Sequence, residues 1–385
     1  MLIQNKKIAI VGGGPAGLTL GRLLQLQDAD VTIYERDVNR DVRVQGSTLD
    51  LHEGTGLEAM KRAGLLDEFY KHHRPLASKM QLVDKSLNIK FDDHNFAEIT
   101  AENRPEIDRA PLRNILLSSL KPGTVVWDSH FIQMEKQDKG WLLYLSNGKT
   151  AYADLVIAAD GANSKIRPYI SDIKPIYSGI TLIEGNIYQA DKNTPKLFGF
   201  ARGGKVMAFD NEQFIGYGTK ADDSIMFVAC FKCTENWLAQ SNIDFKNKAQ
   251  VLEFFKKEFA GWSADWQEFF TNDQVHFIPR PQYYFPYNQS WETQENLTMI
   301  GDAAHRMPPF AGEGANVAMQ DSFELAQVLT SNKFADLKTA IAHFEKDMIA
   351  RGAAATKDTL ENTQRMFSPA GLQQMISFFN QVQPS

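Results

Sequence analysis

Three glycines near the start of the chain have the spacing of a loop that binds a phosphate group. Gly12, Gly14 and Gly17 form the pattern G-x-G-x-x-G, with Ala16 inside it. Glycines at these positions let the backbone turn tightly and approach a pyrophosphate held at a helix N-terminus. Glu35 ends the next predicted strand, where its carboxylate can accept both hydroxyls of an adenosine ribose and would repel a 2′-phosphate. We therefore predict a dinucleotide site here.

A second polar segment favours a flavin over a nicotinamide as the resident dinucleotide. Asp302 follows a predicted buried strand, so its carboxylate can bond a ribityl hydroxyl. Backbone amides at the start of the next helix can face the pyrimidine edge of a flavin. This edge becomes anionic on reduction, so a helix N-terminus there favours the reduced, oxygen-reactive form. His305 is better explained by packing or hydrogen bonding after a tight turn than by proton transfer.

The only two cysteines, Cys230 and Cys233, have the C-x-x-C spacing that also occurs in redox and zinc sites. They lie in an apolar run typical of a strand, in which residues three apart face opposite sides of a sheet. No further residues with zinc-ligand spacing lie near them. We predict two structural cysteines and no metal site.

These residues need particular elements to position them. A strand at 7–11, the glycine loop, a helix at 18–26 and a strand at 30–35 together predict a β-α-β unit with parallel strands. Further helices are predicted at 57–63, 111–120, 246–259 and from 314 nearly to the C-terminus, and strands at 124–128, 141–146, 154–159 and 297–300, with a hairpin turn at Asn147–Gly148.

The pattern changes between 174 and 296 to short alternating strands with many aromatic residues. We expect a discontinuous nucleotide-binding domain of residues 1–72, 99–173 and 294–345. A mostly β substrate domain is expected to comprise residues 73–98 and 174–293. Residues 346–385 are expected to form a helix that bridges both domains, and simple packing is the alternative.

Charge and hydropathy narrow the class of protein. The 385 residues include 41 basic and 47 acidic side chains, a net charge of -6 that provides no basic surface for nucleic acid or an anionic membrane. The sequence contains neither an apolar stretch of the roughly 20 residues that cross a bilayer nor a signal-peptide pattern. We expect a cytoplasmic enzyme and, since no feature requires an oligomer, a monomer.

Three motifs occur in the order found in a known family. The glycine pattern, the segment 160–167 that begins with Asp160-Gly161, and Gly301-Asp302 resemble the motifs of single-component (class A) aromatic-hydroxylase-type flavoprotein monooxygenases. The resemblance spans most of the chain. It implies an α/β fold with a p-hydroxybenzoate-hydroxylase-like, Rossmann-type FAD domain, an inserted mostly β substrate domain and a C-terminal helix. It also implies bound FAD and transiently bound NADPH, both associated with the Asp-Gly motif.

Within that family the chain looks most like the tetracycline-inactivating, TetX-like branch, through segments 34–37, 46–52, 105–109 and 301–312. This resemblance implies that Arg43 contacts NADPH, although a solvated surface role for Arg43 is equally open. The FAD contacts expected from the motifs and the resemblance are Gly12, Gly14, Ala16, Gly17, Glu35, Arg36, Asp50, Arg109, Asp160, Asp302, Pro309, Gly312, Gly314, Ala315 and Asn316.

The expected substrate domain departs from this branch. Glu184, Lys205 and Met226 occupy positions at which the branch has what resembles a glutamine, an arginine and a histidine. In a buried pocket, such changes alter which ligand fits. For Glu184 and Lys205, ordinary surface charge is the alternative. The expected substrate contacts are Glu184, Lys205, Met226, Pro309, Phe310 and Gly312; Phe209, Phe214 and Phe227 are candidates for a cavity wall, with core packing as the alternative for each.

The function expected from this combination is an FAD-dependent monooxygenase. It would take hydride from NADPH and transfer one oxygen atom of O2, through a C4a-hydroperoxyflavin, to a small electron-rich phenol or enol, with tetracycline as one candidate. The flavin supplies the chemistry, so no catalytic side-chain nucleophile is expected. A disulfide-reductase flavoenzyme or a flavin halogenase would need motifs that the sequence lacks. The open alternative is a non-catalytic flavoprotein that sequesters a drug or metabolite.

Overall fold

A five-stranded sheet carries the N-terminal glycine loop. The computed structural model describes residues 2–42, 46–94, 104–272 and 275–382. The sheet has the strand order β17-β11-β1-β2-β7, and all its pairings are parallel. Its strands are β1 (Lys7–Val11), β2 (Asp30–Tyr34), β7 (Val125–Val126), β11 (Leu155–Ala158) and β17 (Leu297–Met299). Most of these residues are buried and apolar, as expected for a parallel sheet covered on both faces.

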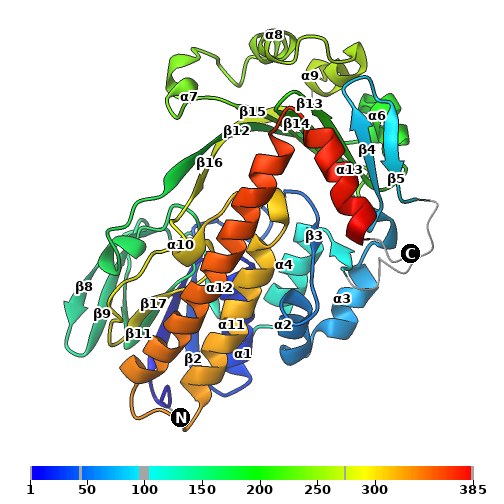
Figure 1. The fold of residues 1–385 in the computed structure, drawn as a ribbon. Coiled ribbons are helices and arrows are strands. Elements are labelled where there is room, and N and C mark those ends of the chain that lie inside the picture. Colours follow the sequence, from blue (N-terminus) through cyan, green and yellow to red (C-terminus); the bar gives the residue numbers. More distant parts are fainter. Residues whose placement is uncertain (1, 43–45, 95–103, 273–274, 383–385) are drawn as a thin grey trace.

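The predicted β-α-β unit is confirmed. β1 and β2 pair in parallel from Lys7 opposite Asp30 to Val11 opposite Tyr34. The helix between them, α1 (Pro15–Gln25), begins three residues earlier than predicted. A proline fits the first turn of a helix, where its missing N–H would have no partner. α1 packs against α11 (Gly314–Thr330), and α11 packs against α12 (Leu337–Met366), in front of the sheet in Figure 1.

A larger sheet of seven strands lies at the other end of the molecule (Figure 1). Its order is β16-β12-β15-β14-β13-β4-β5. The strands are β4 (Met80–Asp84), β5 (Ile89–Asp92), β12 (Ile176–Ile187), β13 (Lys205–Asp210), β14 (Gln213–Thr219), β15 (Ile225–Lys232) and β16 (His276–Tyr284). This is the alternating, aromatic-rich region of the sequence.

The two faces of the seven-stranded sheet have different partners. On the outer face, Phe227 stacks on Phe269 with ring centroids 4.4 Å apart, beneath helices that include α8 (Lys248–Glu258). On the inner face, Phe209 and Phe214 pack together at 5.0 Å. Because side chains alternate along a strand, Phe227 cannot wall a cavity on the same face as Phe214. Core packing, the alternative for Phe227, is therefore what the structure shows.

The C-terminal stretch forms two helices rather than one. α12 begins at Leu337, where the Asp336 side chain accepts from the Thr339 N–H at 2.8 Å as an N-cap, and it ends at Met366. α13 (Gly371–Val382) follows a break at Ser368-Pro369, because proline restricts the preceding residue and cannot continue a helix. α12 contacts the segment at 309–311, and α13 packs on β4 and β13. Glu345 Oε1 in α12 also accepts from the Thr298 hydroxyl in β17 at 2.8 Å, so the C-terminal helices touch both sheets. The predicted domain boundaries remain a prediction.

The remaining elements connect these layers. The predicted hairpin turn at Asn147–Gly148 joins β9 (Gly140–Leu145) to β10 (Thr150–Ala153), with Gly148 at φ +78°. These elements are β3 (Leu49–Asp50), α2 (Gly56–Arg62), α3 (Leu66–His72), η1 (Pro75–Ser78), β6 (Glu106–Ile107), α4 (Arg109–Ser118), β8 (Phe131–Gln137), β9 (Gly140–Leu145), β10 (Thr150–Ala153), η3 (Arg167–Tyr169), α5 (Ala190–Asn193), α6 (Pro195–Ala201), α7 (Trp237–Gln240), η4 (Ala264–Gln267), α9 (Glu268–Thr271), α10 (Asp302–His305) and η5 (Pro309–Ala311).

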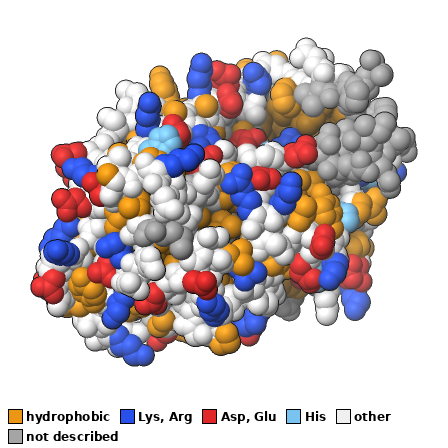
Figure 2. All heavy atoms as spheres, turned by 90° about the horizontal axis from the view of Figure 1, so that it is seen from below, with side chains coloured by type: hydrophobic (Ala, Val, Ile, Leu, Met, Phe, Trp, Pro, Cys, Tyr) orange, Lys and Arg blue, Asp and Glu red, His pale blue; other side chains and the backbone are white. Residues whose placement is uncertain are grey.

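The surface carries both signs of charge. On the face seen in Figure 2, basic and acidic side chains are interspersed, as the near balance of charges predicts. None of the helices in the described ranges combines the length and apolar character needed to cross a bilayer.

Candidate active site

The glycine loop is shaped by close backbone contacts on one side and open on the other. Gly12 has φ +112°, and a Cβ there would lie 2.2 Å from the Ala159 carbonyl oxygen. A Cβ on Gly17 would lie 2.0 Å from the Gly12 carbonyl oxygen. At Gly14, by contrast, a Cβ would meet no atom within 4 Å, immediately before the first residue of α1. This open space at a helix N-terminus fits a pyrophosphate.

Glu35 lies against the glycine loop and also forms a hydrogen bond with it. The side chain is 2% exposed, its Oε2 accepts from the Gly13 N–H at 2.6 Å, and its Oε1 accepts from the Asp37 N–H at 3.0 Å. The carboxylate therefore lies against the glycine loop at the end of β2, where the sequence predicts a ribose contact. Its role towards a ribose remains a prediction.

The Asp-Gly motif lies beside the glycine loop. A Cβ on Gly12 would lie 3.0 Å from Asp160 Cα. Asp160 Oδ2 accepts from the Lys165 N–H at 2.8 Å, while Oδ1 is buried without a partner in the described protein. Burial raises the pKa of Asp160. An unpartnered buried carboxylate oxygen next to an open phosphate cradle fits a hydroxyl donor from a bound nucleotide.

Arg167, the last residue of the segment 160–167, has a structural role. It is 4% exposed, donates from Nη1 to the carbonyls of Ala303 and Ala304 at 2.9 Å, and lies 3.5 Å above the Phe285 ring. It therefore anchors the end of α10, the short helix that begins with Asp302.

Asp302 is exposed at the start of α10, and a buried network holds the turn before it. Asp321 Oδ2 accepts from the Gly301 N–H at 2.9 Å and from His305 Nε2 at 2.6 Å. Asp321 Oδ1 accepts from Arg351 Nη2 at 2.8 Å. His305 is thus a hydrogen-bonding residue, the reading favoured from the sequence. The network joins the Asp302 turn to α11 and α12.

Gly301 brings this turn to the glycine loop. A Cβ on Gly301 would lie 3.6 Å from the Cβ of Ala16, and Ser322 in α11 donates to the Ala16 carbonyl at 2.9 Å. The structure therefore brings together all three motifs: the Gly12–Gly17 loop, Asp160 and the Gly301–Asp302 turn.

Asn316 connects the start of α11 to strand β3. It is fully buried, its Nδ2 donates to the Asp50 carbonyl at 2.9 Å, and its Oδ1 accepts from the His52 N–H at 2.9 Å. Gly312 has φ +73°, and a Cβ on it would lie 3.5 Å from Asp50 Oδ1. The structure thus brings Asp50 together with predicted residues from the distant segment between Gly312 and Asn316.

The Asp50 carboxylate belongs to a charged cluster. Its Oδ2 lies 3.0 Å from His52 Nε2 and 2.9 Å from Arg104 Nη2. Burial would raise the pKa of Asp50, but the His52 hydrogen bond and the charges of Lys205 and Arg104 lower it to about 2. Burial would lower the pKa of His52, but hydrogen bonds to Asp50 and Glu313 raise it to about 9. Sequence reasoning did not single out His52 or Arg104, although His52 belongs to the resembling segment 46–52.

Two of the three predicted arginines, Arg36 and Arg109, are exposed. Arg36 is exposed just after β2. Arg109 is exposed at the first residue of α4, and its Nε donates to the Ser47 carbonyl at 3.2 Å. Arg43 lies outside the described residues. The cofactor roles of all three remain predictions.

Lys205, Met226 and Glu184 lie on the inner face of the seven-stranded sheet. Lys205 is opposite Gly218, and Gly218 is opposite Met226, so these residues share one row across β13, β14 and β15. Glu184 is buried two residues from Asn186, which is opposite Met226. Arg280 Nε donates to Glu184 Oε2 at 2.5 Å. Glu184 is therefore a buried, paired carboxylate rather than ordinary surface charge.

Lys205 connects this face to the two-stranded ribbon of β3 and β6. Its Nζ forms an ion pair with Glu106, whose side chain is 3% exposed, and Glu106 is opposite Asp50 in the ribbon. Glu106 was not predicted as a site residue, although it lies in the resembling segment 105–109. A carboxylate in a two-residue strand gives no periodic signal of burial, so only its position in that segment could have indicated it.

An apolar cluster adjoins this polar row. Phe310 packs against Phe367 with centroids 5.1 Å apart, and Phe367 contacts Phe214 at 6.5 Å. Phe310 and Pro309 form the short η5 helix before α11. Two predicted substrate residues, Pro309 and Phe310, therefore lie between α11 and the aromatic part of the inner face.

The cysteines agree with the structural prediction. Cys230 is buried in β15, Cys233 follows the strand, and both are free thiols. Burial raises the pKa of Cys230, which keeps it protonated.

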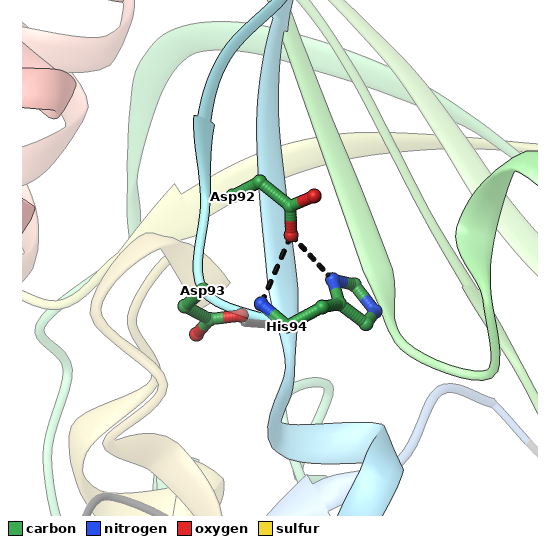
Figure 3. Close-up of side chains that lie close together, drawn as sticks. All are labelled: Asp92, Asp93 and His94. Atoms are coloured by element: carbon green, nitrogen blue, oxygen red, sulfur yellow. Dashed lines mark hydrogen bonds and ion pairs between the residues drawn. The ribbon is translucent and has the colours of Figure 1, made fainter. Parts of the chain in front are cut away.

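Figure 3 shows one further group of potential ligands, Asp92, Asp93 and His94, beyond the site. Asp92 Oδ1 accepts from the His94 N–H at 2.9 Å and lies 2.7 Å from His94 Nδ1. Asp92 Oδ2 pairs with Arg202 at 2.9 Å, and Asp93 Oδ1 accepts from the Met80 N–H at 2.6 Å. The atoms named here are already engaged, one of them with a cation, whereas His94 Nε2 is buried without a hydrogen-bond partner among the described residues. The group forms a hydrogen-bonded turn at the end of β5, and no metal is assigned to it.

Comparison with known proteins identifies a family model that matches most of the chain. Residues 5–333 match the family model described as "FAD binding domain". Monooxygenase penA of Penicillium thymicola is 28% identical, over 96% of this chain and 97% of its own length. The 3-amino-4-hydroxybenzoate 2-monooxygenase PtmB3 of Streptomyces platensis is 26% identical, over 97% of this chain and 91% of its own.

Solved structures share the fold. The tetracycline destructase Tet(55) superposes with a TM-score of 0.78, covering 99% of this chain and 96% of its own at 20% identity. At this identity the likeness concerns the fold alone. The predicted fold class, an α/β FAD-binding fold of the p-hydroxybenzoate-hydroxylase type with a β-rich sheet, is confirmed.

Proposed function

Since the chain belongs to the family of proteins with this FAD-binding domain and is an FAD-dependent monooxygenase, we propose that it uses NADPH and O2 to hydroxylate a small electron-rich phenol or enol. The observation that carries the proposal is the convergence of three motifs at an open helix N-terminus. The Lys205–Glu106 ion pair also joins the inner face of the seven-stranded sheet to the ribbon that contains Asp50. The proposed enzyme acts as a cytoplasmic monomer.

The protein's part in the reaction is binding and orientation. The N-terminus of α1 at Gly14 would hold the FAD pyrophosphate, and Glu35 and Asp302 would bind its sugar hydroxyls. The start of α11, fixed by Asn316, would face the flavin ring. When bound, the flavin supplies hydride transfer and oxygen activation. The exposed Arg36 and Arg109 are proposed contacts for the FAD phosphates, and Arg43 is the proposed contact for NADPH.

The inner sheet face would hold the substrate. Lys205, Met226 and Glu184 would line its polar end, and Phe310 with Pro309 and Gly312 would border its aromatic end. Apolar side chains around Phe367 would keep water away from the reacting atoms. No side-chain nucleophile is required.

Two named proteins guide the choice of substrates. PtmB3 is named for an aminohydroxybenzoate, and Tet(55) for tetracycline. The first supports a phenolic ring as substrate. Tetracycline remains a candidate on the shared fold, although Glu184 and Lys205 are committed to ion pairs with Arg280 and Glu106.

The test is turnover by the FAD-loaded protein. We would supply NADPH or NADH with phenols, 3-amino-4-hydroxybenzoate or tetracycline, and follow reductant oxidation, O2 uptake and product mass under heavy-isotope O2. The proposal expects substrate-stimulated oxidation of NADPH and a product containing one labelled oxygen atom. Tight binding of a compound without any turnover would instead support a flavoprotein that sequesters its ligand.

A further inference from the structure

Lys220 is a buried cation whose charge is not matched by a direct partner. The residue is 8% exposed, and its Nζ donates to Asn186 Oδ1 at 3.3 Å. Among the described residues it forms no ion pair with a carboxylate. Burying an ammonium group is costly unless an anion compensates its charge.

Three carboxylates act electrostatically on Lys220, and all three are bonded to other groups. Glu184 pairs with Arg280, Asp108 pairs with Arg74 and accepts from the Ala221 N–H, and Asp222 accepts from the Ser224 N–H and hydroxyl. Burial lowers the pKa of Lys220, although these three charges oppose that shift. The local protein therefore stabilises the ammonium only partly.

Lys220 lies at the polar end of the proposed substrate face. It directly follows β14, two residues beyond Gly218, and its partner Asn186 is opposite Met226. Gly218 is opposite Lys205. Lys220 is thus next to the row that contains the predicted substrate residues.

Gly218 leaves room on this face. A Cβ there would have only Lys205 Cγ at 3.5 Å and the Gly204 carbonyl oxygen at 3.9 Å as neighbours, which are ordinary contacts. A side chain would therefore fit where the sequence has none. The gap lies beside Lys205, which is already paired with Glu106, and Lys220 is two residues further along the chain from Gly218.

We propose that Lys220 binds an anionic oxygen of the substrate, a carboxylate or an ionised phenol or enol, at the gap left by Gly218. The inference rests on the proposed function and narrows its substrate class to organic anions. Charged hydrogen bonds are the stronger ones, so replacing the ammonium should weaken anion binding by about tenfold or more.

Calorimetric titration of the FAD-loaded protein tests this with two matched pairs of probes. Benzoate is compared with neutral benzamide, and 4-nitrophenolate with neutral 4-nitroanisole, so that a carboxylate site and a phenolate site give different results. The variant is Lys220→Met. The control is Lys232→Met on the same sheet, because Lys232 is half-exposed and paired with Glu212 at 2.7 Å.

The expected result is that at least one anion binds about tenfold or more tightly than its neutral counterpart to the wild type and to Lys232→Met. Lys220→Met should lose that preference and keep its flavin content. The proposal is overturned if the wild type prefers neither anion, if the preference survives in Lys220→Met, or if this variant loses its flavin. Turnover is assayed separately, so anion preference without oxygenation would count against the proposed function and not against this site.

Discussion

Lys205 forms an ion pair with Glu106 across the boundary between the seven-stranded sheet and the β3–β6 ribbon. The lysine end is one-third exposed at 33%, whereas the glutamate side chain is 3% exposed. The contact places a predicted substrate residue next to Asp50, a predicted FAD contact. It also makes a clear prediction about stability.

Replacing Lys205 by Met should lower the free energy of unfolding by about 3 kcal/mol, because Glu106 would stay buried without a countercharge. Urea unfolding of the FAD-loaded protein measures this. The double variant Lys205→Met/Glu106→Gln should recover much of the loss. Lys232→Met, which removes an exposed pair, should cost less than about 1 kcal/mol. Equal losses in the two lysine variants would contradict the assignment.

Two glycines of the loop should respond differently to alanine. Gly12→Ala should destabilise the protein by about 3 kcal/mol or more, because of its positive φ and its contact with Ala159. Gly14→Ala should change stability by no more than about 0.5 kcal/mol, since its Cβ meets no protein atom. The added methyl group would instead occupy the proposed pyrophosphate space. Fluorescence titration with FAD should show at least about tenfold weaker binding, a modest loss for a displaced phosphate contact. Unchanged affinity in Gly14→Ala would place the pyrophosphate elsewhere.

Asn316→Ala should lower the free energy of unfolding by about 2 kcal/mol, because the Asp50 carbonyl and the His52 N–H lose a buried partner. FAD binding should weaken as well, since these bonds join β3 to the start of α11. Asn114→Ala, at an exposed position of the partly buried helix α4, serves as the control, with an effect below about 1 kcal/mol. Similar effects in both variants would show that Asn316 does not hold these elements together.

The His305–Asp321 pair predicts a pH dependence. Burial alone would lower the pKa of His305, but Asp321 raises it above the ordinary 6.5; burial would raise the pKa of Asp321, but His305 and Arg351 lower it below the ordinary 3.8. The charged pair therefore contributes its full stabilisation of the fold at pH values between 3.8 and 6.5. It is lost as pH rises through the folded pKa of His305, and as pH falls through that of Asp321.

Comparing the wild type with His305→Gln tests this dependence, because glutamine keeps a donor without the charge. The stability difference, measured by urea unfolding from about pH 5 to 9, should be largest at the acidic end and shrink as pH rises. A difference that grows towards alkaline pH would show that His305 is buried in its neutral form.

Local patterns predicted the elements that carry the cofactor motifs. The strand at 7–11, the helix after the glycine loop and the parallel strand at 30–34 follow from β-branched runs, glycines and helical spacing. The same patterns predicted the hairpin at Asn147–Gly148 and buried strands at 154–159 and 297–300, which the structure has at Leu155–Ala158 and Leu297–Met299. The C-terminal stretch differed because one proline, Pro369, separates two helices that each have good helical composition.

The pairings between distant residues could not be predicted in the same way. Glu106, His52 and Asp321 have no periodic signal, and each acquires its partner only when segments far apart in sequence meet. Lys220 looks like any polar residue in a turn, because its burial depends on the sheet that covers it. Phe227 and Phe214 are both aromatic residues in strands, and only the register assigns them to opposite faces.

The most direct measurement is the flavin content of the purified protein, determined from its visible absorption before and after incubation with excess FAD and gel filtration. We predict one tightly held FAD per chain, and poorer retention in Asp302→Ala. A protein that stays without visible absorption after exposure to FAD, while its far-ultraviolet dichroism shows it to be folded, would contradict the assignment of the three converging motifs to a flavin.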